Sequence, residues 1–128
     1  MDPVVHFEMP ADDRKRMSEF YEKVFGWKTK RMGEEMGNYV VVTTTELDEK
    51  GFPKEVGRIN GGFYPKDTTR PAQYPSVVIS VENIRESMKK INGARGKVLG
   101  NPLKFHSSVC MSPLLIQKET ESLYCNQR

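Results

Sequence analysis

Hydrophobic residues near the start of the chain follow first a strand pattern and then a helix pattern. Residues 4–9 alternate between apolar and polar positions, as in a strand with one buried face. After the turn at residues 10–13, apolar residues recur at helical spacing and form one stripe, which consists of Met17, Phe20, Tyr21, Val24 and Phe25. We expect Asp12 to cap the start of this helix and Gly26 to end it.

Further strands are predicted after this helix. Residues 27–30 form a short strand pattern, and residues 39–45 form a longer one that is rich in β-branched side chains. Residues 56–64 contain the next strand. Within it, Gly61-Gly62 indicates either a bulge or a close approach of another part of the chain.

The same order of elements then begins again. Residues 76–81 form a strand pattern, and a helix opens at Glu82-Asn83 and stops at Gly93. Its apolar positions are Ile84, Met88 and Ile91, and a short strand follows at residues 97–99. A repeat of about seventy residues is too long for a solenoid. It favours a duplicated module whose two halves pair into one curved sheet, the alternative being the chance occurrence of two common strand–helix–strand units.

Length and composition limit the classes of protein that fit. A chain of 128 residues suits one domain, with module one at about residues 1–66 and module two at about 75–128. No apolar run approaches the roughly 20 residues of a membrane span. The net charge of +3 is interleaved with acidic residues, unlike the concentrated basic patch of a nucleic-acid binder. With no secretory signal at the N-terminus, we expect a cytoplasmic protein without a membrane or nucleic-acid partner.

Three segments carry a family resemblance. They read VVHFEMPADDRKRMSEFYEKVFGWK from residue 4, GRINGGFYPK from residue 57, and PSVVISVENIRESMKKINGARGKVLGNP from residue 75. Together they resemble the vicinal oxygen chelate superfamily, which includes glyoxalase, bleomycin resistance and extradiol dioxygenase proteins. The resemblance implies an α+β fold in which two βαβββ modules form a U-shaped mixed sheet. It also implies a homodimer and a cleft that often holds a divalent metal.

The metal positions of that superfamily are mostly changed here. His6 lies fourteen residues before Phe20 and matches the first ligand position. The glutamate of the fourth strand is replaced by Gly61 or Gly62, and the histidine that opens the second module is Ser76. One neutral donor competes poorly with water for a divalent ion. We therefore expect no metal, with His6 as the remaining candidate ligand if Zn, Ni, Fe or Mn binds.

Candidate cleft residues follow from the same resemblance. The candidates for binding a ligand are His6, Phe7, Trp27, Tyr39, Phe63 and Ser76, and Tyr64 is a further aromatic that could line an apolar cleft. Glu8 lies two residues after His6, on the same face of the strand, and is a candidate general base. The alternative is that the aromatic residues fill the core and that Glu8 is an ordinary strand residue.

The tail after about residue 103 departs from the family. All ten glycines precede it, and both cysteines, Cys110 and Cys125, lie within it. Permitted codons for residues 109–127, read in a shifted frame, encode VYVSFIDTEGNRESILQP, which is a strand, a turn and a strand of the expected family type. We interpret the tail as the product of a frameshift, which sequencing of the gene would test. In the present frame, residues 109–111 and 114–116 are apolar enough to form substitute strands around Pro113.

Three functions are compatible with the sequence. The first is a metal-free domain that binds a small organic molecule, without an assigned catalytic residue. The second is a divalent-metal-dependent lyase or isomerase, similar to lactoylglutathione lyase, or a dioxygenase. The third is an inactive remnant that still folds.

Overall fold

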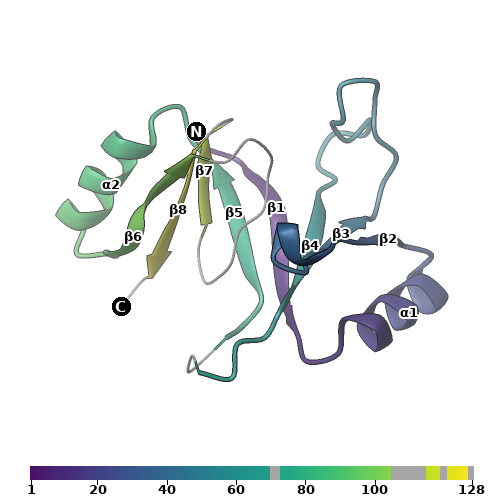
Figure 1. Ribbon diagram of the computed structural model, residues 1–128. Helices are drawn as coiled ribbons and strands as arrows, with labels where there is room; N and C mark the ends of the chain where they lie inside the picture. The colour runs from purple at the N-terminus through teal and green to yellow at the C-terminus, as the bar shows by residue number, and fades with distance from the viewer. Residues whose placement is uncertain (70–72, 105–114, 119–120, 127–128) are drawn as a thin grey trace.

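The protein forms one mixed sheet of eight strands with a helix in each half, as seen in a computed structural model (Figure 1). The structure describes residues 1–69, 73–104, 115–118 and 121–126, with side chains as far as residue 98. The elements of the first half are β1 (Val4–Ala11), α1 (Arg14–Phe25), β2 (Lys28–Arg31), the 3-10 helix η1 (Glu34–Met36), β3 (Val40–Thr43) and β4 (Asn60–Pro65). Those of the second half are β5 (Ser76–Ser80), α2 (Ile84–Gly93), β6 (Lys97–Lys104), β7 (Leu115–Lys118) and β8 (Glu121–Asn126).

The strand order confirms the predicted α+β architecture of two modules. The order across the sheet is β2-β3-β4-β1-β5-β7-β8-β6. The two modules join where β1 pairs with β5 in antiparallel fashion. Each module also contains one parallel pair, β1 with β4 and β5 with β7. The first strand of each module therefore lies at the centre of the sheet.

The ending of the second module is atypical, as the change in sequence pattern predicts. In the first module, the last strand, β4, lies beside the first strand, β1, and is followed outward by β3 and β2. A second module with the same topology would have the order β5, β8, β7 and β6 outward from the centre of the sheet. Here β7 lies beside β5, and β8 lies between β7 and β6. The predicted strand at residues 109–111 lies outside the described residues, as does Leu114. The strand β8 was not predicted, and the frameshift stays a prediction.

The start of α1 differs from the expectation by one residue. Asp13, not Asp12, is the N-cap, and its side chain accepts a hydrogen bond of 3.0 Å from the backbone N–H of Arg16. The reason is that β1 continues to Ala11 and leaves Asp12 in the connection, where it forms an ion pair of 3.3 Å with Lys66. Gly26 ends the helix as predicted, with a left-handed φ of 69°.

Each module has its own hydrophobic core. In the second module, α2 packs through its three predicted apolar positions together with Ile79, Val81 and Val98. In the first module, the buried residues are Ala11, Val40, Val42 and Phe63, and partly buried side chains pack on them, among them Phe7, Met9, Met17, Tyr21 and Trp27. The predicted stripe of α1 is only partly buried, because Phe20, Val24 and Phe25 are 53%, 54% and 59% exposed.

No helix among the described residues is long and apolar enough to cross a membrane. The cytoplasmic location and the homodimer stay predictions.

Candidate functional site

The two faces of β1 carry different chemistry. Phe7 lies opposite Gly61 of β4 and Val77 of β5, and the side chains of this row share one face of the sheet. Glu8 follows directly and therefore points to the other face. The pairing of β1 with both neighbours thus separates an apolar row from a polar row.

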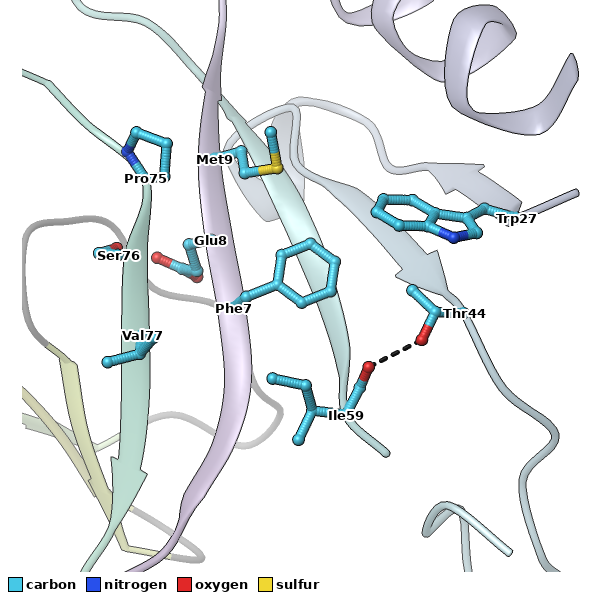
Figure 2. A pocket seen from close by; sticks show the side chains of 9 residues that line it. All are labelled: Phe7, Glu8, Met9, Trp27, Thr44, Ile59, Pro75, Ser76 and Val77. Carbon is cyan, nitrogen blue, oxygen red and sulfur yellow. Dashed lines mark hydrogen bonds between the residues drawn. The ribbon is translucent and has the colours of Figure 1, made fainter. Parts of the chain in front are cut away.

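An apolar cavity lies along the Phe7 side of β1. Its volume is about 680 Å³, within the usual range for sites that bind small molecules. Figure 2 shows its lining residues, which are Phe7, Glu8, Met9, Trp27, Thr44, Ile59, Pro75, Ser76 and Val77. The carboxylate of Glu8 is directed toward β5, away from the rings of Phe7 and Trp27 (Figure 2). The wall on the Trp27 side of the cavity is therefore apolar.

Trp27 presents one side of its indole ring to this cavity. The ring is stacked on Tyr21 of α1, with a centroid distance of 4.6 Å and an interplanar angle of 15°. It also touches Phe7 in a tilted contact with a centroid distance of 5.6 Å. Phe25 makes a further tilted contact with the indole at 5.9 Å. Tyr21 covers one face of the indole, and the part of Trp27 that lines the cavity is available to a ligand.

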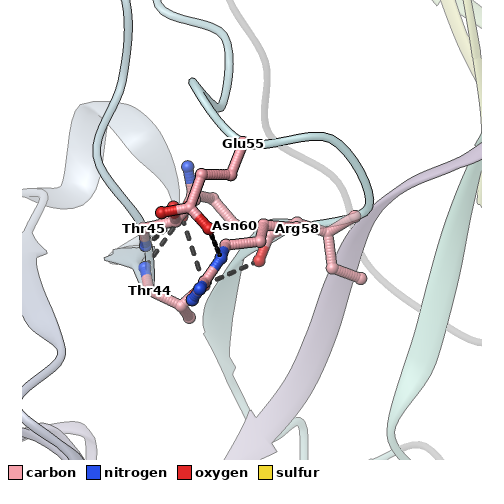
Figure 3. A network of polar contacts seen from close by, with 6 residues as sticks. Thr44, Thr45, Glu55, Arg58 and Asn60 are labelled. Atoms are coloured by element: carbon pink, nitrogen blue, oxygen red, sulfur yellow. Dashed lines mark hydrogen bonds and ion pairs between the residues drawn. The ribbon is translucent and has the colours of Figure 1, made fainter.

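The rim of the cavity is fixed by a network of hydrogen bonds around Asn60 (Figure 3). The side-chain oxygen of Asn60 accepts hydrogen bonds from the backbone N–H groups of Thr44 and Thr45, at 2.7 and 3.2 Å. The hydroxyl of Thr44 donates to the carbonyl oxygen of Ile59 at 2.8 Å. The hydroxyl of Thr44 is thus hydrogen-bonded within the protein, and the methyl group of Thr44 faces Trp27 (Figure 2). Beside the network lies an exposed ion pair between Glu55 and Arg58.

The glycine pair in β4 makes room on both faces of the sheet. A Cβ atom on Gly61 would lie 2.4 Å from the ring of Phe7. A Cβ atom on Gly62 would lie 1.8 Å from the hydroxyl oxygen of Tyr39. The sequence left open whether the glycine pair marks a bulge or a close approach, and the structure shows a close approach. Gly61 leaves room for the ring of Phe7 on the apolar face, and Gly62 leaves room for the hydroxyl of Tyr39 on the polar face.

The polar face contains a chain of three hydrogen-bonded side chains. The hydroxyl of Tyr39 donates to Glu8 Oε1 at 3.0 Å and lies 3.0 Å from His6 Nε2. Because the single hydroxyl proton points to Glu8, the oxygen of Tyr39 must accept from His6, which fixes the proton of the neutral imidazole on Nε2. Glu8 and Tyr39 are 1% and 2% exposed. The chain therefore holds a carboxyl group almost completely away from solvent.

Burial lowers the pKa of His6 from 6.5 to about 4, so this histidine is neutral at pH 7. As the pH falls from about 6.5 toward 4, the unfolded chain takes up a proton at this site that the folded chain does not. Stability therefore falls with the pH across this window.

Replacing His6 with glutamine is expected to reduce this pH dependence. Between pH 7 and pH 5, the wild type should lose about 1–2 kcal/mol more free energy of unfolding than His6→Gln. Glutamine can still donate to Tyr39, but it does not titrate. Urea unfolding of both proteins at the two pH values measures the difference. Equal losses in the two proteins would contradict the assignment.

The residues at the superfamily's metal positions do not fit a divalent ion. His6, Gly62 and Ser76 lie on one face, as the resemblance implies. However, Nε2 of His6 is engaged by Tyr39, and the hydroxyl of Tyr39 fills the space above Gly62. Ser76 offers only a neutral hydroxyl, which makes no hydrogen bond within the described part of the chain. The described residues also contain no group of three or more His, Cys, Asp or Glu side chains that could hold a metal ion.

The structure brings only some of the predicted cleft residues together at the cavity. Phe7, Trp27 and Ser76 line it, as does Glu8. His6 and Tyr39 lie in the polar chain behind Glu8. Phe63 is fully buried in the core, and Tyr64 is 1% exposed and donates to the carbonyl oxygen of Tyr74. Their roles in binding stay predictions.

Sequence reasoning missed five lining residues, which are Met9, Thr44, Ile59, Pro75 and Val77. Met9 could have been found, because strand alternation places it on the same face as Phe7. Pairing between β1 and β5 brings Val77 to this site, and the hydrogen bonds around Asn60 fix Thr44 and Ile59 there.

An N-terminal segment, about a third of the chain, matches a known family model. Residues 4–45 match the family model described as bleomycin resistance protein-like N-terminal. No curated protein matches the sequence.

Solved structures share the fold at low sequence identity. A methylmalonyl-CoA epimerase from Mycobacterium tuberculosis has a TM-score of 0.54 at 8% identity, over 80% of this chain and 71% of that chain. A methylmalonyl-CoA epimerase in complex with methylmalonyl-CoA and NH4+ has a TM-score of 0.55 at 13% identity, over 84% and 79%. A glyoxalase/bleomycin resistance protein/dioxygenase superfamily member from Vibrio splendidus 12B01 has a TM-score of 0.52 at 15% identity, over 83% and 80%.

Proposed function

We propose that the chain is a metal-free member of the vicinal oxygen chelate superfamily and that it binds a small organic molecule in the cavity beside Trp27. The match of residues 4–45 to the bleomycin resistance protein-like N-terminal model and the similarity of the fold to that of a glyoxalase/bleomycin resistance protein/dioxygenase superfamily member support the assignment to this superfamily. The observation that carries this proposal is the cavity itself, with a volume of about 680 Å³ and walls formed by Phe7, Trp27 and other apolar side chains. Such pockets bind ligands mainly by removing apolar surface from water.

The donor set supports the metal-free part of this proposal. A catalytic divalent ion needs about three protein donors that converge on it, with an open position for the substrate. Gly62 supplies no side-chain donor, and Tyr39 lies between His6 and Glu8, so these two side chains do not converge on one point. The alternatives are a metal-dependent lyase, isomerase or dioxygenase, and a remnant without a ligand.

Two measurements on the purified protein test the proposal. Trp27 is the single tryptophan of the chain, so its fluorescence reports directly on the cavity. Screening small aromatic and aliphatic compounds should reveal some that change this fluorescence and also raise the Tm, because a ligand at about 100 times its Kd stabilises the folded state by about 2.7 kcal/mol.

Metal analysis separates the alternatives. Protein purified without a chelator should contain far less than one divalent ion per chain. About one tightly bound ion per chain would favour the metal-dependent alternative. A protein that binds neither a metal nor any compound of the screen would favour the inactive remnant.

A further inference from the structure

The chemistry of the cavity wall narrows the class of ligand, on the premise that the proposed function is correct. We infer that the cavity selects an uncharged compound with a flat ring, which packs against the side of Trp27 that Tyr21 leaves uncovered. The inference rests on three properties of the cavity wall. Trp27 lines the cavity with part of its indole, the hydroxyl of Thr44 is hydrogen-bonded within the protein, and the carboxyl group of Glu8 points away from Trp27.

The free side of Trp27 favours a flat ring. Tyr21 already stacks on the indole at 4.6 Å and 15°, so α1 holds the ring in a fixed orientation. A planar ligand on the other side would continue this stack. Aromatic pairs in offset-stacked or edge-on geometry gain stabilisation beyond that of their buried area, whereas a saturated ring of equal size gains the burial alone.

On the Trp27 side of the cavity, the polar groups give no partner to a charged ligand. The hydroxyl of Ser76, which makes no hydrogen bond within the described part of the chain, lies on β5 at the position opposite Glu8 and carries no charge. The hydroxyl of Thr44 donates to the carbonyl oxygen of Ile59, and Asn60 engages the backbone N–H group of Thr44. The carboxylate of Glu8 points toward β5 and accepts from Tyr39 (Figure 2). A charge brought against Phe7 and Trp27 would therefore lose its hydration without a compensating contact.

A matched series of ligands tests the inference by calorimetry. The probes are 2-naphthalenemethanol, 2-naphthoate, 2-naphthylmethylamine and the saturated decahydro-2-naphthalenemethanol. The neutral aromatic alcohol should bind at least about tenfold more tightly than the two charged probes and about two- to tenfold more tightly than the saturated alcohol. If a charged or saturated probe binds as tightly as the alcohol, the inference is overturned while the proposed binding function stands. If no probe binds and the wider screen is also silent, the proposed function fails.

A pair of valine substitutions locates the binding. Val77 lines the cavity and is 38% exposed, whereas Val41 of β3 does not line it and is 37% exposed. Val77→Asp places a carboxylate on the wall and should weaken the alcohol and strengthen the amine, which reverses their order. Val41→Asp introduces the same charge elsewhere on the sheet and should leave both affinities unchanged. Equal effects of the two substitutions would overturn the assignment to this cavity.

A second copy of the chain is the competing occupant of this surface. Sedimentation of the wild type and of Val77→Asp distinguishes it from a small ligand. An unchanged oligomeric state together with the reversed ligand preference supports the inference. Dissociation of a dimer by Val77→Asp would identify the cavity as part of an interface and overturn it.

Discussion

Replacing Gly62 with alanine is expected to lower the free energy of unfolding by about 3 kcal/mol. The new Cβ atom would lie 1.8 Å from the hydroxyl oxygen of Tyr39 and 2.0 Å from its Cζ atom. Tyr39 is 2% exposed, so its ring is enclosed by protein and cannot relieve the clash by turning into solvent without losing its packing. Any shift that relieves the clash also breaks the hydrogen bond to the buried Glu8. Urea unfolding at pH 7 measures the loss.

Gly93 provides the control for this substitution. It is the last residue of α2, its φ is not left-handed, and a Cβ atom there would meet nothing within 4 Å. Gly93→Ala should leave stability unchanged or raise it by up to about 1 kcal/mol, since alanine is the better helix residue. If Gly62→Ala costs no more than Gly93→Ala, then Tyr39 does not occupy the space above Gly62.

Replacing Tyr39 with phenylalanine is expected to cost about 2 kcal/mol of unfolding free energy at pH 7. The substitution keeps the ring and removes the hydroxyl that donates to Glu8 and contacts His6. A buried acceptor that loses its donor is penalised because water cannot replace the lost hydrogen bond. In a Glu8→Gln background the same substitution should cost less, because an amide is easier to bury than a carboxylate. Denaturant unfolding of the four proteins gives the coupling energy.

Tyr21 offers a matched control for the loss of a tyrosine hydroxyl. It packs its ring on Trp27, and its hydroxyl makes no hydrogen bond among the described residues. Tyr21→Phe should change stability by less than about 0.5 kcal/mol. A similar loss in Tyr21→Phe and Tyr39→Phe would mean that the contact with Glu8 adds nothing to stability.

The changed metal positions have a physical explanation in these contacts. The position that the superfamily fills with a glutamate in the fourth strand is occupied here by a glycine, and the hydroxyl of Tyr39 enters the space that the missing side chain leaves. The polar face is thus filled by a hydrogen-bonded chain within the first module. The proposed ligand site lies on the opposite face of β1, where Phe7 and Trp27 meet the cavity.

Local patterns in the sequence were sufficient for most helices and strands. Alternation predicted β1, a strand pattern at residues 76–81 predicted β5, and helical spacing predicted α1 and α2. Gly26 was correctly expected to end α1. These features depend on near neighbours in the chain, where backbone geometry and side-chain period dominate. The boundary at Asp13 was missed by one residue, because pairing extends β1 to Ala11 and this depends on a partner strand.

Contacts between distant segments required the tertiary structure. The exchanged order of β7 and β8 depends on which of the two strands pairs with β5, and no local sequence pattern encodes that pairing. The sequence placed His6 and Glu8 on one face, but Tyr39 joins them only because β3 and β1 flank β4 and Gly62 lacks a side chain. The sequence alone therefore determined most of the element types and which residues stand at the positions that the resemblance assigns to metal ligands. Only the tertiary structure decided which side chains are in contact. The register and the order of the strands set the distances between residues that are far apart in the sequence, and the spacing of residues along the chain does not determine them.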